Sequence, residues 1–341
     1  MLPGGEPSPQ RPARVEFGLL AGARPRAPQG GLDVMKVPEP FDLELTVRSH
    51  GWYDLPPWRW DEERGVLSRP VSLSTGRVAV VEVAQGEREL AFRALARGRL
   101  SAAEAREARG ALATCLSLDE DLAPFRARAI ALEGERVAGR RDLPDLRWAL
   151  ARGAGRLLRS PTVFEDAVKT LCTTNCSWAL TRLMVERLCA ALGEEGPGGE
   201  RAFPLPARMA AEPERFFREV VRAGYRAPFL AALARDVASG ALDLEALRGS
   251  ELPTPELLAR LRALRGFGPY AAEHLLRLLG RHDHLALDSW TRGKLARLRR
   301  RRRPPSDRTL RRWYAPYGPW AGLAMWLEVT ADWHGDRPSW P

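Results

Sequence analysis

The segment 262–292 brings a glycine-flanked turn, an apolar run and a carboxylate into one short stretch. Gly266 and Gly268 permit a tight turn that residues with a Cβ would resist, and Pro269 fits the first position of a following helix. A helix that begins directly after such a turn presents free backbone N–H groups. Its dipole favours an anion such as a DNA phosphate. An ordinary helical hairpin explains the pattern equally well, because Gly-x-Gly turns are common.

Two predicted helices position this turn, and together they form a helix-hairpin-helix over residues 254–280. Thr254-Pro255-Glu256 suits the start of the first helix, whose apolar face then carries Leu257, Leu261 and Leu264. The second helix has an apolar stripe and ends at Gly280. The stripe consists of Ala272, Leu275, Leu276 and Leu279. Phe267, between the two glycines, is expected to anchor the turn in the core.

The run Leu264-Arg265-Gly266-Phe267-Gly268, followed by Ala271-Ala272 and then Asp288, resembles the motif of one known superfamily. It is similar to the helix-hairpin-helix (HhH-GPD) DNA glycosylases, which carry a Gly/Pro-rich hairpin and a following aspartate. Asp288 lies 18 residues after Tyr270, a spacing similar to that of the family. The resemblance implies a glycosylase of base excision repair whose partner is double-stranded DNA with a damaged, flipped-out base.

By this resemblance Asp288 is the candidate catalytic residue. Breaking the bond between C1′ and the base nitrogen puts positive charge on the sugar, which a carboxylate can stabilise while it orients the attacking water. Asp288 also suits the N-cap of a helix that begins at Ser289. The two roles are compatible, because a capping aspartate is held rigidly.

The residue at position 270 bears on the reaction and on the substrate. The superfamily has Lys there in enzymes that also cleave the strand, and Tyr270 cannot form the Schiff base. Lys294, on an exposed-looking part of the next helix, is a poor substitute, so we expect a monofunctional hydrolase without AP-lyase activity. An aromatic residue here resembles the alkylated-base glycosylases, whose rings stack on cationic bases. Alkylated purines such as 3-methyladenine are the first substrate expected.

Other segments resemble the 8-oxoguanine DNA glycosylases, which makes oxidised guanine the second substrate candidate. These segments are residues 173–189 and 224–227. Asn175 matches an Asn that those enzymes insert into the duplex, although a buried turn Asn is an equal alternative. Leu180 stands where they have an Arg that contacts the opposite base. A DNA-damage-binding protein that has lost catalysis is a third alternative.

The resemblance also implies further site residues. Trp178, Tyr270 and His274 are expected to line the base pocket, although a helix-surface position is as good for His274. The expected DNA contacts are Asn175, Arg265, Gly266, Phe267, Gly268, Ala271 and Arg292. A monovalent Na⁺ or K⁺ ion could be held by backbone carbonyls near Leu264 and Gly266. The arginine-rich run 292–312 suits either a solvated loop or a DNA-backbone patch.

The predicted fold is α+β and mostly helical. Residues 1–35 are expected to be a disordered, basic Pro/Gly-rich tail. Residues 36–140 form an N-terminal α/β domain with a small antiparallel sheet, and 141–335 form a two-lobed all-helical catalytic region. Strands are expected at 41–47, 66–73 and 78–83, followed by a helix over 90–116. The aromatic cluster Trp52, Tyr53, Trp58 and Trp60 favours a core role over base stacking.

Composition agrees with a polyanionic partner, because the 341 residues carry a net charge of +10. None of the four cysteines forms a C-x-x-C pair, so no iron–sulfur cluster is expected. Cys172 and Cys176 favour core packing, and the segment 282–284 (His-Asp-His) favours a loop over a metal site. The chain has neither a membrane-spanning run nor a signal-peptide core. We expect a cytoplasmic monomer, which would be associated with the nucleoid if the protein is bacterial.

Overall fold

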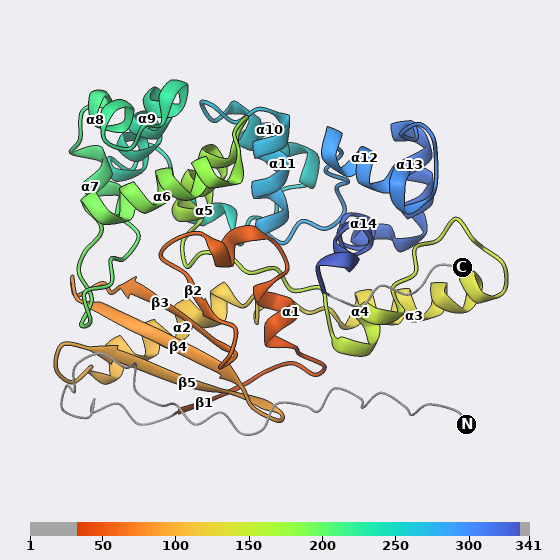
Figure 1. Cartoon of the computed structure of the whole chain (residues 1–341), viewed down its shortest axis with the longest axis horizontal. Helices are drawn as coiled ribbons and strands as arrows, with labels where there is room; N and C mark the ends of the chain where they lie inside the picture. The colour runs from red at the N-terminus through yellow and green to blue at the C-terminus, as the bar shows by residue number, and fades with distance from the viewer. Residues whose placement is uncertain (1–32, 335–341) are drawn as a thin grey trace, which may run out of the picture.

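The computed structural model describes residues 33–334, and its N-terminal part is a five-stranded antiparallel sheet. The strand order is β1-β5-β4-β3-β2, and the sheet lies at the lower left in Figure 1, below helices α7–α9. The strands expected at 66–73 and 78–83 are confirmed as β3 and β4. The strands are β1 (Asp33–Lys36), β2 (Arg59–Asp61), β3 (Val66–Ser72), β4 (Val78–Gln85) and β5 (Glu89–Ala96). The predicted α+β, mostly helical fold is confirmed.

Two predicted elements of this domain are wrong. Residues 41–47 are not a strand but contain helix α1 (Leu43–Val47), because the side chain of Asp42 caps it by accepting the N–H of Leu45. Residues 90–116 are not one helix. They contain β5 and then α2 (Ala102–Cys115), since pairing with β4 and β1 on both sides outweighs the helical preference of the Ala- and Leu-rich sequence.

The tail predicted for residues 1–35 falls mainly on residues 1–32, which lie outside the described part of the chain. Its last three residues belong to β1, which pairs with β5 at the edge of the sheet. Helix α2 begins with a capping box formed by Ser101 and Glu104 and packs against β4 and β5. The sheet therefore has its own core between its inner face and this helix.

The helices form two lobes with separate cores, as predicted. The first lobe runs from α5 to α11, and the second contains α3, α4 and α12–α14 (Figure 1). Phe125 and Leu132 of α3 pack in the same core as Leu310 and Trp313. Helix α3 therefore belongs with the C-terminal helices, although the sequence grouped residues up to 140 with the sheet.

The bounds of the helices follow from the same structure. The second lobe contains α3 (Ala123–Val137), α4 (Arg147–Arg152), α12 (Ser289–Leu298), α13 (Asp307–Tyr314) and α14 (Ala321–Thr330). The first contains α5 (Val163–Thr173), α6 (Trp178–Leu192), α7 (Pro206–Ala210), α8 (Glu214–Glu219), α9 (Ala227–Ala238), α10 (Thr254–Ala263) and α11 (Pro269–Leu278). No helix within residues 33–334 is long and apolar enough to cross a membrane.

A buried ion-pair cluster ties the sheet to the first lobe. Glu165 of α5 pairs with Arg69 of β3 and with Lys169, each at 2.7 Å, and all three side chains are buried. The carboxylate of the next residue, Asp166, accepts a hydrogen bond from the indole N–H of Trp52 at 2.8 Å. Breaking one partner of such a cluster would leave an uncompensated buried charge. These contacts fix the loop that carries His50 and Trp52 against α5.

Candidate active site

The turn between α10 and α11 has the predicted helix-hairpin-helix geometry. Gly266 has φ +85°, and a Cβ built there would lie 2.7 Å from the ring of Phe229, so only glycine fits. Phe267 is buried in the core of the first lobe, which confirms its anchoring role. The stripe of α11 is buried as predicted, and Gly280 follows the helix with φ +79°. The hairpin is thus fixed by the packing of Phe267 and of the apolar stripe of α11 in the core of the first lobe.

The start of α11 is exposed, and no side chain of the described residues caps it. Pro269 has no N–H. The amides of Tyr270 and Ala271 make no backbone hydrogen bond within the described part of the chain. Gly268 and Arg265 are exposed at the same turn. The predicted anion-binding groups are therefore available.

The monovalent ion remains a prediction. The carbonyl of Leu264 already accepts the N–H of Phe267 at 3.0 Å, which closes the turn. Among the described residues, the carbonyl of Gly266 accepts no backbone hydrogen bond. The turn therefore offers one clearly unengaged carbonyl oxygen to such an ion.

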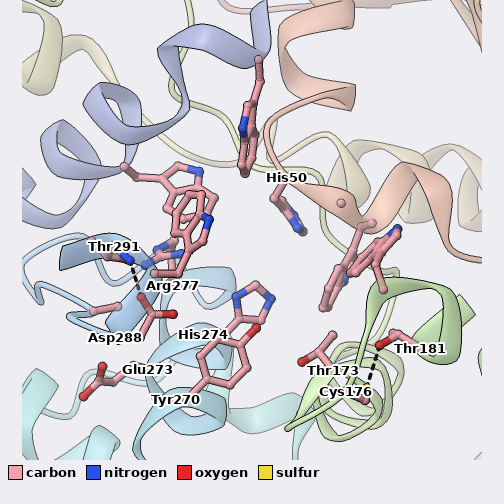
Figure 2. A pocket seen from close by; sticks show the side chains of 17 residues that line it. His50, Thr173, Cys176, Thr181, Tyr270, Glu273, His274, Arg277, Asp288 and Thr291 are labelled. Carbon is pink, nitrogen blue, oxygen red and sulfur yellow. Dashed lines mark hydrogen bonds between the residues drawn. The ribbon is translucent and has the colours of Figure 1, made fainter. Parts of the chain in front are cut away.

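A cavity of about 570 Å³ lies beside the hairpin, where α11, the start of α12, the α5–α6 turn and the start of η1 (Gly51–Asp54) with the preceding His50 meet. Figure 2 shows side chains from all four segments around it. Tyr270, His274, Trp178 and Asp288, which the sequence placed in the site, all line this cavity. The remaining lining residues are His50, Gly51, Trp52, Thr173, Cys176, Thr181, Glu273, Arg277, Ala286, Trp290, Thr291, Trp326 and Trp333.

Asp288 is held rigidly at the edge of the cavity as the N-cap of α12. Its Oδ1 accepts the N–H of Thr291 at 2.7 Å, a bond drawn in Figure 2. Oδ2 makes no hydrogen bond with the described residues. The capping role predicted for Asp288 is confirmed, and one carboxylate oxygen remains available to a ligand.

Aromatic rings form one wall of the cavity. Tyr270 and His274, one turn apart on α11, are nearly parallel with ring centroids 6.1 Å apart. His274 then meets Trp52 at 4.9 Å. The indole N–H of Trp178 donates to the carboxylate of Asp54 at 2.6 Å. The same indole packs against Gly51, where a Cβ would lie 2.5 Å from the ring. Trp52, from the aromatic cluster at residues 52–60 that the sequence assigned to the core, is buried and also lines the cavity.

Two histidines in the cavity are electrically neutral. Burial lowers the pKa of His50 to about 4 and holds the pKa of His274 well below its usual value. The Nε2–H of His50 donates to the carbonyl of Leu158 at 2.6 Å, which leaves Nδ1 as an acceptor. Within residues 33–334, neither His50 Nδ1 nor His274 Nε2 has a hydrogen-bond partner.

Arg277 brings a positive charge into the cavity. Its guanidinium lies 4.0 Å from the ring centroid of Trp326, a buried residue of α14. It makes no ion pair with a carboxylate of the described residues. Burial lowers the pKa of Arg277 to about 10, opposed by Tyr270, Asp288 and Glu273, so the side chain stays charged at neutral pH.

Comparison of the whole structure with solved proteins identifies the fold. A 3-methyladenine DNA-glycosylase from Archaeoglobus fulgidus superimposes with a TM-score of 0.66, 19% identity and coverage of 86% of this chain and 97% of that one. MBOgg1 in complex with a low-affinity DNA ligand superimposes with a TM-score of 0.66 and 19% identity, over 90% of this chain and 100% of that one. The apo 8-oxoguanine glycosylase/lyase of Clostridium acetobutylicum superimposes with a TM-score of 0.57 and 18% identity, over 82% of this chain and 93% of that one. The chain has the fold of the helix-hairpin-helix DNA glycosylases. No protein-family model and no curated protein matches the sequence.

Lysine is rare in this glycosylase-like chain, since the 341 residues include only Lys36, Lys169 and Lys294. None of them lines the cavity. Lys169 is fully buried against Glu165, and Lys294 pairs with Asp332. The exposed position predicted for Lys294 is wrong, because this ion pair packs its side chain against the second lobe.

The turn between α5 and α6 presents Asn175 to solvent, so the alternative of a buried turn residue is wrong. Its backbone is left-handed, with φ +45°, and its amide donates to the hydroxyl of Tyr225 at 3.3 Å. Tyr225 is itself about half exposed in η2 (Gly224–Arg226). The two sequence segments that resemble 8-oxoguanine glycosylases therefore meet at one exposed point.

Other predicted residues lie apart from the cavity. Arg292 forms an exposed ion pair with Asp307, at 2.9 Å. His282 is buried and stacks on Trp320, while the carboxylate of Asp283 accepts the hydroxyl of Thr254. The described residues contain no cluster of three metal-ligating side chains.

Sequence reasoning missed His50, Trp52 and Arg277 as cavity residues. Positions 270, 274 and 277 share one face of a helix, so spacing alone would have identified Arg277. No local signal connects His50 to α11, because the contact depends on the packing of the sheet domain against the first lobe.

Proposed function

We propose that this chain is a monofunctional DNA glycosylase that hydrolyses the N-glycosidic bond of a damaged base. The observation that carries the proposal is Asp288, a rigid carboxylate at the edge of an aromatic cavity that adjoins the open helix-hairpin-helix turn. A volume of about 570 Å³ suits a flipped-out nucleobase, which would stack on the rings of Tyr270 and His274.

The chemistry assigned to Asp288 is electrostatic and acid–base. As the C1′–N bond breaks, positive charge develops on the sugar, and a fixed carboxylate stabilises it. A water molecule bound to the carboxylate attacks C1′ and gives up its proton to it. The N-cap bond to Thr291 holds the carboxylate in place, so little reorganisation accompanies the reaction.

The proposed lack of lyase chemistry is supported by the positions of the amines in the described part of the chain. A Schiff base at C1′ needs an uncharged amine in contact with the sugar. Position 270 holds a phenol, and Lys169 and Lys294 are engaged in ion pairs. Neither of them lines the cavity, and neither does Lys36. Hydrolysis is then the only route that the described side chains support.

Duplex binding is assigned to two exposed turns, the helix-hairpin-helix turn before α11 and the α5–α6 turn. The N–H groups that open α11 would bind a phosphate, and exposed Arg265 lies beside them. Asn175 and Tyr225 would fill the space that the flipped base leaves in the duplex. Leu180, which is exposed on α6, offers no hydrogen bond to the opposite base, so we expect weak opposite-base discrimination.

The proposal is tested by incubating the protein with duplexes that each carry one lesion. The panel contains 3-methyladenine, 7-methylguanine, 8-oxoguanine and hypoxanthine, and free bases are identified by mass spectrometry. We expect release of at least one base and a strand that stays intact until it is heated in alkali. Binding to lesion duplexes without release of any base would instead support the inactive damage-binding alternative.

A further inference from the structure

We propose that Arg277 makes the base pocket select an uncharged base over a cationic one, an inference that rests on the glycosylase function proposed above. The substrate class is a damaged base that is neutral in DNA and presents carbonyl oxygens or unprotonated ring nitrogens. This reverses the order of the sequence-based candidates, because alkylated purines such as 3-methyladenine carry a positive charge.

The position of Arg277 carries the inference. Tyr270, His274 and Arg277 follow one another along the cavity face of α11, as Figure 2 shows. A base stacked on Tyr270 and His274 therefore lies within the reach of the guanidinium. Trp326 covers the guanidinium from the other lobe at 4.0 Å. The indole face stabilises the charge of Arg277 in the free protein. It accepts no hydrogen bond in the guanidinium plane, so the N–H groups of Arg277 remain available to a base.

The remaining charges in the cavity do not cancel this effect at the base. Glu273 is engaged by Arg262 of α10 at 2.9 Å, and His284 approaches it at 3.4 Å. Asp288 is fixed at the start of α12, where the sugar is expected. His50 and His274 are neutral. Arg277 is thus the only cationic side chain among the described residues that line the cavity.

The direction of electron flow gives Arg277 a part in the reaction as well. When the C1′–N bond breaks heterolytically, its electron pair stays on the base. An uncharged base then leaves as an anion, which takes a proton from water after release, whereas a cationic base leaves uncharged. A fixed cation lowers the barrier for the first case and raises the cost of binding in the second.

The histidines provide complementary hydrogen bonding for an uncharged base. His50 Nδ1 is a buried acceptor without a partner among residues 33–334, and His274 Nε2 is also unpartnered. An unsatisfied buried polar atom costs free energy until a ligand binds it. A base with an N–H group on one edge and a carbonyl on another would satisfy His50 and Arg277 together.

The test compares Arg277→Met with Arg277→Lys, which keeps the charge, and with Arg208→Met, which removes an exposed arginine of α7. Single-turnover base release is measured on duplexes carrying 8-oxoguanine or hypoxanthine, which are uncharged, and 7-methylguanine or 3-methyladenine, which are cationic. We expect wild type and Arg208→Met to favour the uncharged bases. Arg277→Met should lose about a hundredfold on them, without a comparable loss on the cationic bases, and Arg277→Lys should recover part of the rate.

Several results would overturn the inference. Preferential release of cationic bases by the wild type would by itself overturn the inference, whatever the Arg277 variants show. An equal loss on both classes in Arg277→Met, with an unchanged melting temperature, would reduce Arg277 to a general structural role. If the wild type releases no base from any duplex, the glycosylase proposal itself fails, and the inference fails with it. Release without charge preference overturns the role of Arg277 alone.

Discussion

Gly268 offers a direct perturbation of the turn that is proposed to bind DNA. Its backbone has φ −70° and ψ −177°, which any residue adopts, and no heavy atom of residues 33–334 lies within 4 Å of a Cβ built there. Gly268→Val should therefore fold normally. Gly266→Ala should not, since φ is +85° and Phe229 lies 2.7 Å from the new Cβ.

The expected loss follows from the number of bonds at this turn. A valine side chain on the exposed surface would keep a phosphate from the N–H groups of Tyr270 and Ala271. A hydrogen bond to a charged group contributes about 1.5–3 kcal/mol, so the loss of one of the two bonds weakens binding about ten- to a hundredfold, and the loss of both weakens it further. The loss should be the same with and without a lesion, because a phosphate carries no sequence information.

Fluorescence anisotropy with labelled duplexes over a series of salt concentrations measures the effect. The substitution removes no cation, so the slope of log Kd against log salt should stay constant while every affinity falls. Gly249→Val is the control, because this exposed glycine precedes the opposite end of α10 and also has open space at its Cβ. An unchanged affinity of folded Gly268→Val at low and moderate salt would refute a DNA site at the hairpin.

Two further predictions use other side chains of the cavity. Because the pKa of buried His50 is about 4, below its value near 6.5 in the unfolded chain, the stability that neutral His50 contributes above pH 6.5 is lost as the pH falls toward 4. Urea unfolding at pH 7 and 4.5 should show a loss larger by about 2–3 kcal/mol in the wild type than in His50→Gln, and equal losses would contradict the burial argument. Borohydride should trap no covalent adduct of the wild type with lesion-containing DNA, whereas Tyr270→Lys should give weak trapping. Efficient trapping by the wild type would contradict the monofunctional assignment and direct attention to Lys294.

The hairpin and the aspartate could be predicted because their signals are local. Gly266, the buried Phe267, the apolar stripe of α11 and the capping position of Asp288 all lie within one short segment. Each is determined by backbone geometry or by helical periodicity, and both can be inferred from residues close by in the sequence. The structure agrees with the sequence at each of these points.

The failures share a different cause, since each depends on partners distant in the chain. The strand β5 has a helix-like composition and becomes a strand because β4 and β1 pair with it on both sides. His50 reaches the cavity only because Asp166 and Glu165 tie the sheet domain to α5. Lys294 looked exposed until Asp332, from the end of the described chain, provided its ion pair.

The most direct test of the central proposal is the single-turnover rate of base release by Asp288→Asn. Asparagine caps a helix about as well as aspartate, so α12 should remain intact. Asp243→Asn is the control, because Asp243 likewise accepts a backbone N–H, from Ala246, but lies outside the cavity. On the lesion that the wild type processes best, we predict that Asp288→Asn loses at least about a thousandfold in rate while its duplex affinity stays within about twofold. Release by Asp288→Asn at the rate of the wild type and of Asp243→Asn would contradict the assignment of Asp288 as the catalytic carboxylate.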